Sequence, residues 1–191
     1  MAKESSFKNM VITLSVICLV CSALLGVVYS VTKAPIEAAE LAKINNAIKA
    51  VVPECNNNPS EEMMKVEGSV VYPAKMDGTI VGYAIKVNAS GFSGPLQMMV
   101  GFKTDGTIYN TSVISHSETP GLGAKITGEI PTRTQIVGKN PASSNLTVTK
   151  DGGEIDAITA STITSRGFLR GVDAAYKVFV ELQKQQQPWE N

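Results

Sequence analysis

A long uncharged run near the N-terminus limits the structures that this chain can form. The 22 residues from Met10 to Val31 include no Asp, Glu, Lys, Arg or His. A helix needs about 20 apolar residues to cross a bilayer's hydrocarbon core, whereas a secretory signal has an apolar segment of only about 7–15. The run therefore predicts a single, uncleaved transmembrane helix within an anchor that covers residues 1–33.

The charges beside this run predict its orientation. Lys3 and Lys8 precede it, while Lys33 follows it with Glu37 and Glu40 close by. Positive residues favour the cytoplasmic side of a membrane. We expect the N-terminus to be cytoplasmic and the main domain to lie on the periplasmic (extracytoplasmic) side of the cytoplasmic (inner) membrane.

Composition excludes some classes of site. Lys plus Arg and Asp plus Glu both number 17, so the chain has no basic field for nucleic acid. The pair Cys18 and Cys21 lies in the apolar run, where small side chains commonly pack between helices, and Cys55 stands alone. A metal cluster would need further ligands. We predict no metal site.

Residues 34–60 are predicted to form a linking helix and a turn. Apolar residues recur at helical spacing after Pro35, and the helix should end before Pro53. Pro35 is a candidate bend. Residues 55–60, which read CNNNPS, are predicted to form an exposed turn.

Residues 61–191 are predicted to form an α+β domain, an antiparallel sheet with packing helices. From Met64 to Ser115, short β-rich runs are separated by turn signals, and the pairs Asp77-Gly78 and Asp105-Gly106 are typical of tight hairpin turns. The Gly-rich stretch 89–95, with Phe92 at its centre, is either a plain connection or a loop that contacts a ligand or partner.

The second half of this domain is predicted to hold loops, one strand from Leu146 to Thr149, and a C-terminal helix that ends at Pro188. One apolar stripe at helical spacing predicts the core face of that helix. The stripe consists of Ile163, Leu169, Val172, Tyr176, Phe179 and Leu182.

The single histidine opens a Gly-rich segment, His116 to Ile126, which reads HSETPGLGAKI. Two glycines around Leu122 allow the backbone to approach a ligand closely. His116 is either a structural hydrogen-bonding residue or the base of a hydrolase. A metal site at His116 and Glu118 lacks further ligands.

The stretch from Asp156 to Arg166, DAITASTITSR, places five hydroxyls within seven positions just before and inside the predicted helix. Ser and Thr are favoured at helix starts because they accept bonds from unpaired backbone N–H groups. One cap needs one hydroxyl, however, and a helix start is also a natural seat for phosphate. The hydroxyls can therefore serve as a helix cap or as a phosphate site, and the residues alone do not decide between the two. The hydroxyls belong to Thr159, Ser161, Thr162, Thr164 and Ser165.

This stretch resembles the flavinylation motif of FMN-binding domains in membrane electron-transport complexes, Asp-x-x-Ser/Thr-Gly-Ala-Thr. The resemblance implies that Thr162 carries FMN through a phosphoester, with Asp156, Thr159 and Ser161 in the same motif. Two residues depart from the family pattern, Ala160 in place of Gly and Ser161 in place of Ala.

The histidine segment resembles the same family, in which a Glu-Thr-Pro-Gly-Leu-Gly stretch lies against the flavin. It implies cofactor contacts from Glu118, Thr119, Pro120, Gly121, Leu122 and Gly123. With the anchor, the two motifs resemble the G subunit of Rnf ion-translocating ferredoxin:NAD oxidoreductases, a relative of the C subunit of Na-translocating quinone reductases.

This resemblance implies an electron-transfer subunit with no catalytic residues of its own, which works with other membrane subunits and receives FMN from a flavin transferase. The alternatives are a membrane-anchored binding or assembly module without flavin, and a Ser/Thr hydrolase that uses His116. The sequence assigns no role to Phe92 or the cysteines.

Overall fold

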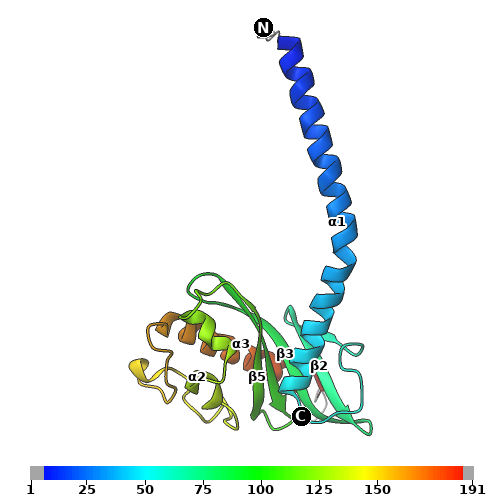
Figure 1. Cartoon of the computed structure of the whole chain (residues 1–191). Coiled ribbons are helices and arrows are strands. Elements are labelled where there is room, and N and C mark those ends of the chain that lie inside the picture. The colour runs from blue at the N-terminus through cyan, green and yellow to red at the C-terminus, as the bar shows by residue number, and fades with distance from the viewer. Residues whose placement is uncertain (1–6, 187–191) are drawn as a thin grey trace. The chain divides into compact units, whose positions relative to one another are not determined.

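The computed structural model describes residues 7–186. Its first element, the helix α1 (Phe7–Val51), contains the whole uncharged run and continues without a break through Pro35 (Figure 1). The predicted helix after Pro35, which ends before Pro53, is confirmed as the second part of α1. Among the described residues, α1 alone is long and apolar enough to cross a membrane. The predicted helix end at Pro188 and the side chain of Trp189 lie outside the described residues.

The chain divides into two units, Met1–Ala42 and Lys43–Asn191. In the first unit, the described residues are all helical. The second unit contains the last turns of α1 and everything that follows. All features described below belong to this second unit.

The predicted antiparallel sheet is confirmed as a five-stranded meander in the order β1-β2-β3-β4-β5. Each strand pairs with its neighbour in sequence, because short turns join them. The strands are β1 (Met64–Val66), β2 (Ser69–Met76), β3 (Thr79–Ser90), β4 (Pro95–Lys103) and β5 (Ile108–His116).

The two Asp-Gly pairs form different turns. Asp77 (φ 51°) and Gly78 (φ 81°) both have the positive φ of a two-residue hairpin turn, as predicted. In the second pair only Gly106 has positive φ (82°), because four residues join β4 to β5 there. The Gly-rich stretch is the turn between β3 and β4.

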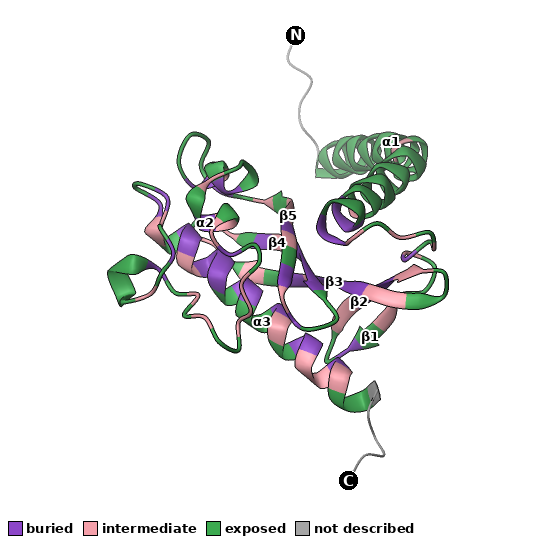
Figure 2. Cartoon of the chain, turned by 90° about the horizontal axis from the view of Figure 1, so that it is seen from below, coloured by how far each residue is buried: buried purple, intermediate pink, exposed green. Residues whose placement is uncertain are grey.

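One face of the sheet packs against the C-terminal helix α3 (Thr162–Gln186). Phe179 contacts the rings of Tyr83 and Phe102, with centroids 5.9 and 5.3 Å apart. Figure 2 shows bands of buried residues alternating with exposed ones along α3. Of the predicted stripe, Leu169, Val172, Phe179 and Leu182 are confirmed as core, Tyr176 is partly buried against it, and Ile163 is 47% exposed. Val172 is nine residues further on, which at 3.6 residues per turn places Ile163 about half a turn around the helix from it, on the face turned away from the sheet.

The other face of the sheet packs against the end of α1, through Ala47, Ile48 and Val51. This contact is close: a Cβ at Gly101 on β4 would lie only 1.5 Å from the Val51 carbonyl oxygen. Glycine at 101 therefore lets the helix end rest directly on the strand.

Three short helices connect β5 to α3: η1 (Gly123–Thr127), α2 (Pro131–Thr134) and η2 (Thr149–Asp151). The prediction of a strand over Leu146–Thr149 is wrong. Only Val148 makes an isolated bridge, to Ile155, and Thr149 begins η2. The alternation in this segment reflects one buried residue, Val148, in a turn that packs against the core.

Candidate functional site

The five hydroxyls at the start of α3 divide into buried and accessible groups. Thr164 and Ser165 are almost fully buried, at 1% and 0% exposure, and Ser161 is 8% exposed. Thr162 is half-buried and Thr159 is exposed. Thr162 is the first residue of α3, so among the hydroxyl residues inside the helix it is the one that keeps part of its surface exposed.

Ser165 fixes the turn that leads into the helix. The Ile158 N–H donates to Ser165 Oγ at 2.9 Å, and Ser165 Oγ donates to the Ser161 carbonyl oxygen at 3.3 Å. The hydroxyl thus joins the first helical turn to the segment before it, which is a capping role for one member of the cluster.

The departure at Ala160 has a structural consequence. Ala160 has a φ of 61°, in the left-handed region where glycine is the usual residue. A β-carbon in this region costs roughly 1–2 kcal/mol. A glycine at this position, as in the motif that the stretch resembles, would adopt the same conformation without this cost.

We expect Ala160→Gly to raise the free energy of unfolding by about 0.5 kcal/mol, because relief of the left-handed strain exceeds the entropy that glycine adds to the unfolded chain. Ala142, exposed and without positive φ, is the matched control. Ala142→Gly should lower the stability by about 0.5 kcal/mol. Chemical denaturation measures both, and a loss of stability in both variants would contradict the prediction.

Glu118 joins three segments that are distant in sequence. Its Oε1 accepts the N–H groups of Phe92 at 2.7 Å and Ser93 at 3.3 Å, and its Oε2 accepts the Thr164 hydroxyl at 2.7 Å. The residue is only 5% exposed. A buried carboxylate is stable only when such donors surround it.

Two glycines make room for this carboxylate. A Cβ at Gly91 would lie 1.9 Å from Glu118 Oε1, and a Cβ at Gly123 would lie 2.3 Å from Glu118 Oε2. Gly123 is thus required by packing, whereas Gly121, with a φ of 76°, is required by backbone conformation.

These residues border a partly open cavity of about 340 Å³, near the lower end of the range for small-molecule sites. The cavity brings together the two motifs that the sequence singled out, with Thr162 at its wall. Its apolar lining includes the exposed side chains of Phe92, Leu122 and Ile163. The lining residues are Phe92, Glu118, Thr119, Leu122, Gly123, Ala160, Ser161, Thr162, Ile163 and Thr164.

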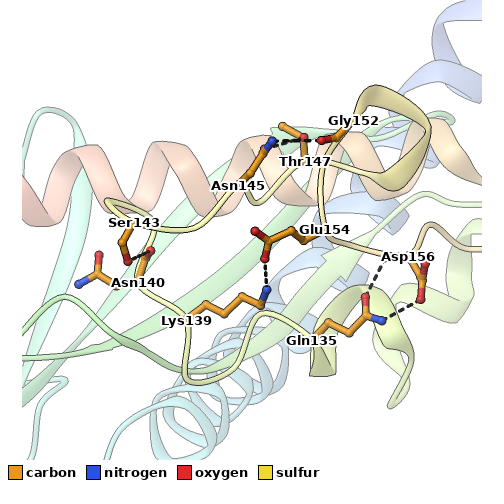
Figure 3. Close-up of polar contacts among 9 residues, drawn as sticks. All are labelled: Gln135, Lys139, Asn140, Ser143, Asn145, Thr147, Gly152, Glu154 and Asp156. Carbon is orange, nitrogen blue, oxygen red and sulfur yellow. Dashed lines mark hydrogen bonds and ion pairs between the residues drawn. The ribbon is translucent and has the colours of Figure 1, made fainter.

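Four residues that the motifs suggested do not line this cavity: Pro120, Gly121, Asp156 and Thr159. Asp156 is tied to α2 instead. Its backbone N–H donates to Gln135 Oε1 at 2.7 Å, and its Oδ2 accepts from Gln135 Nε2 at 2.8 Å (Figure 3). The Thr132 hydroxyl donates to its carbonyl oxygen at 2.6 Å. In this structure Asp156 fixes the segment that approaches α3.

Sequence reasoning missed Lys150 and its neighbours. Lys150 Nζ lies 3.3 Å from the Thr162 hydroxyl oxygen, although the two residues are 12 positions apart. Asp151 accepts two bonds from Arg166, from Nε at 2.7 Å and from an Nη at 2.6 Å. The bond from Arg166 lowers the pKa of the Asp151 carboxyl, and Asp151 raises the pKa of Arg166. The residue types alone gave no signal for either contact.

The direction of these pKa shifts determines the pH range in which Asp151 and Arg166 are both charged. The folded-state pKa of the Asp151 carboxyl lies below its usual value. The ion pair therefore stabilises the fold at every pH above the carboxyl's unfolded-state pKa, which is about 3.9. Its contribution is lost only as the pH falls through the lowered folded-state value. The pair is therefore fully formed at neutral pH.

His116 lies at the end of β5, where its Nδ1 accepts the Glu118 N–H at 3.1 Å. This nitrogen is used in a structural hydrogen bond. Within residues 7–186, no group of three His, Cys, Asp or Glu side chains is arranged to hold a metal ion.

Comparison with known proteins matches the N-terminal helix and the domain that holds the cavity to two family models. Residues 91–177, which contain both motifs, match the model of the FMN-binding domain, and residues 1–51 match the model of the RnfG N-terminal region. The G subunit of the ion-translocating oxidoreductase complex of Vibrio atlanticus is 32% identical over 90% of this chain and 89% of its own length. The chain belongs to the RnfG family.

Other members of the RnfG family are similarly related. The G subunit of the ion-translocating oxidoreductase complex of Methanosarcina acetivorans is 31% identical over 92% of this chain and 95% of its own length. The G subunit of the Na⁺-translocating ferredoxin:NAD⁺ oxidoreductase complex of Acetobacterium woodii is 36% identical over 72% of this chain and 65% of its own length. The family suggested by the two motifs is thus confirmed.

Among solved structures, the crystal structure of Shewanella oneidensis NqrC matches with a TM-score of 0.50, at 22% identity over 60% of this chain and 61% of that one. This likeness shows that the fold is shared between the two proteins. The predicted α+β architecture is confirmed by this match and by the sheet described above.

Proposed function

We propose that this chain is a membrane-anchored electron-transfer subunit of an Rnf-type ion-translocating ferredoxin:NAD⁺ oxidoreductase, and that it carries FMN in a phosphoester bond to Thr162. The observation that carries this proposal is the cavity in which Thr162 faces the segment from Glu118 to Gly123. A flavin exchanges one or two electrons and so links one-electron carriers to two-electron couples.

The site fits the parts of such a cofactor. The apolar side chains of Phe92, Leu122 and Ile163 suit the flat face of an aromatic ring system. Thr162 begins a 25-residue helix, whose first N–H groups and positive dipole end favour a phosphate beside it. Lys150 adds a positive charge at the same hydroxyl.

Attachment is assigned to a separate, Mg-dependent flavin transferase that uses FAD. Thr162 Oγ forms a bond to the phosphorus on the riboflavin side of the pyrophosphate, the bond from that phosphorus to the bridging oxygen breaks, and AMP leaves. The hydroxyl proton is lost. Asp156 and Thr159, both exposed beside the site, are proposed as part of the surface that the transferase contacts.

Part of the support for a covalent link comes from the proposed location. The charges beside the apolar run favour a cytoplasmic N-terminus and an extracytoplasmic domain, where a dissociated flavin would be lost to dilution.

Labelling with an impermeant maleimide tests this orientation. In a chain without native cysteines, Ser143→Cys should react in intact cells and Lys8→Cys only after lysis; the reverse pattern would exclude the proposed topology.

The covalent flavin is tested on the full chain purified from the membranes of its own host. We expect the denatured protein to fluoresce in a gel and to carry the mass of one FMN less one water. A dark, unmodified chain would favour the binding or assembly module without flavin. Hydrolase activity that disappears in His116→Ala would favour the third alternative.

A further inference from the structure

Two side-chain contacts join consecutive residues of η2 to residues one turn apart at the start of α3. Lys150 and Asp151 are consecutive residues of η2. Their partners, Thr162 and Arg166, are four residues apart in α3 and therefore lie on the same face, one turn apart. The backbone of η2 thus runs beside the helix start with both side chains directed toward it.

The backbone that carries these two side chains is fixed by its own hydrogen bonds. The Thr149 N–H donates to the Ile155 carbonyl oxygen at 2.9 Å, and the Gly153 N–H donates to the Val148 carbonyl oxygen at 3.1 Å. Gly152 has a φ of 83°, and a Cβ at Gly153 would lie 2.1 Å from the Thr147 carbonyl oxygen. The loop therefore presents Lys150 and Asp151 from a defined backbone.

The side chain of Lys150 is long, exposed and able to rotate, so the loop backbone alone does not decide how near its ammonium stays to Thr162. The planar fork of Arg166 and the carboxylate of Asp151 form a two-point contact, which restricts rotation of the loop against the helix. That contact uses the fork of Arg166 on Asp151, so Lys150 is the cation that is directed at the hydroxyl.

We propose that the Asp151–Arg166 ion pair positions Lys150 beside Thr162, and that the Lys150 ammonium binds the phosphate that becomes attached to this hydroxyl. This inference rests on the proposed function. Lys150 is then a phosphate-binding residue during transfer and in the finished ester, and Asp151 and Arg166 are positioning residues that act through it.

The experiment measures how fast the apo full chain, in detergent, is modified by purified transferase with FAD and Mg²⁺, using intact mass as the readout. Lys150→Ala should slow modification about ten-fold, because it removes one charge-assisted hydrogen bond, and a bond of this kind at an exposed site has an energy near the lower end of its usual range. Lys150→Arg should keep a rate near that of wild type. The difference between wild type and Lys150→Ala should shrink in high salt, since salt screens exposed charges.

The positioning pair is tested by a charge exchange. Asp151→Asn and Arg166→Gln should each slow modification by a few-fold, because either change frees the loop from the helix. The double variant Asp151→Arg/Arg166→Asp restores an ion pair and should recover most of the rate. Lys139→Ala is the matched control: it removes the ion pair with Glu154, which has no contact with Thr162, and should not change the rate (Figure 3).

The outcomes separate this inference from the proposed function. If wild type is never modified, the proposed function fails. If wild type is modified and Lys150→Ala keeps its rate, phosphate binding by Lys150 is wrong while the covalent flavin stands. If Lys150→Ala is slow but the two single pair variants match wild type, the positioning role is wrong. Thermal unfolding of each variant should match wild type, so that a slow rate is not a folding defect.

Discussion

Thr162→Ala is expected to leave the chain completely unmodified, because the substitution removes the only oxygen through which the proposed ester can form. The native protein should lose in-gel fluorescence and the added mass together. The fold should persist, since Thr162 is half-buried and its hydroxyl contacts the exposed side chain of Lys150. Its free energy of unfolding should change by no more than about 0.5 kcal/mol.

Thr149→Ala is the control for this result. Thr149 is an exposed threonine of η2, outside the motif, so its loss should leave the flavin in place. Thr162→Ser keeps a hydroxyl at the same position and tests whether the transferase accepts a primary alcohol. An adduct that persists on Thr162→Ala would place the attachment elsewhere and overturn the assignment.

Glu118→Ala is expected to lower the free energy of unfolding by about 3 kcal/mol, the largest stability effect among the variants proposed. The change removes a 5% exposed carboxylate that accepts bonds from Phe92, Ser93 and Thr164. It leaves the buried Thr164 hydroxyl and the part-buried N–H groups of Phe92 and Ser93 without their partner, and an unsatisfied buried donor alone costs about 1–3 kcal/mol. Urea denaturation of the full chain in detergent measures the loss.

The same variant should also slow flavin attachment, because the β3–β4 turn, the segment from Thr119 to Gly123 and the start of α3 all meet at this carboxylate. For the effect on stability, Thr119→Ala is the matched control, since Thr119 is exposed and its hydroxyl contact, with Ser93 Oγ, is 3.4 Å long. It should cost less than about 0.5 kcal/mol. Equal stability of the Glu118 and Thr119 variants would show that Glu118 does not hold these segments together.

Elements governed by local periodicity were the easiest to predict. The uncharged run, the spacing of apolar residues after Pro35 and the alternation from Met64 to Ser115 each specified a helix or strands that the structure contains. The strand predicted at Leu146–Thr149 was wrong, because a few alternating residues also fit a turn with one buried side chain. The prediction for Ile163 was wrong because this residue lies about half a turn around the helix from Val172 and so is not on the buried face.

The motifs were found from sequence, but their geometry was not. Glu118 was expected beside the cofactor, and it lines the cavity while also bonding Thr164 and the β3–β4 turn. Phe92 was left without a role, and it lies at the same cavity. Both facts depend on a hairpin turn meeting a helix start, which no residue pattern along the chain records.

A membrane-length helix, an antiparallel sheet and a hydroxyl-rich start to the C-terminal helix could all be predicted from local composition and periodicity. Which of those hydroxyls are accessible depends instead on how the folded chain packs. The packing of α3 on the sheet sets the rotation of the helix, so that Thr164 and Ser165 turn inward and Thr162 faces the cavity and Lys150. That rotation comes from long-range side-chain contacts, such as Phe179 against Tyr83 and Phe102, that the linear sequence does not specify.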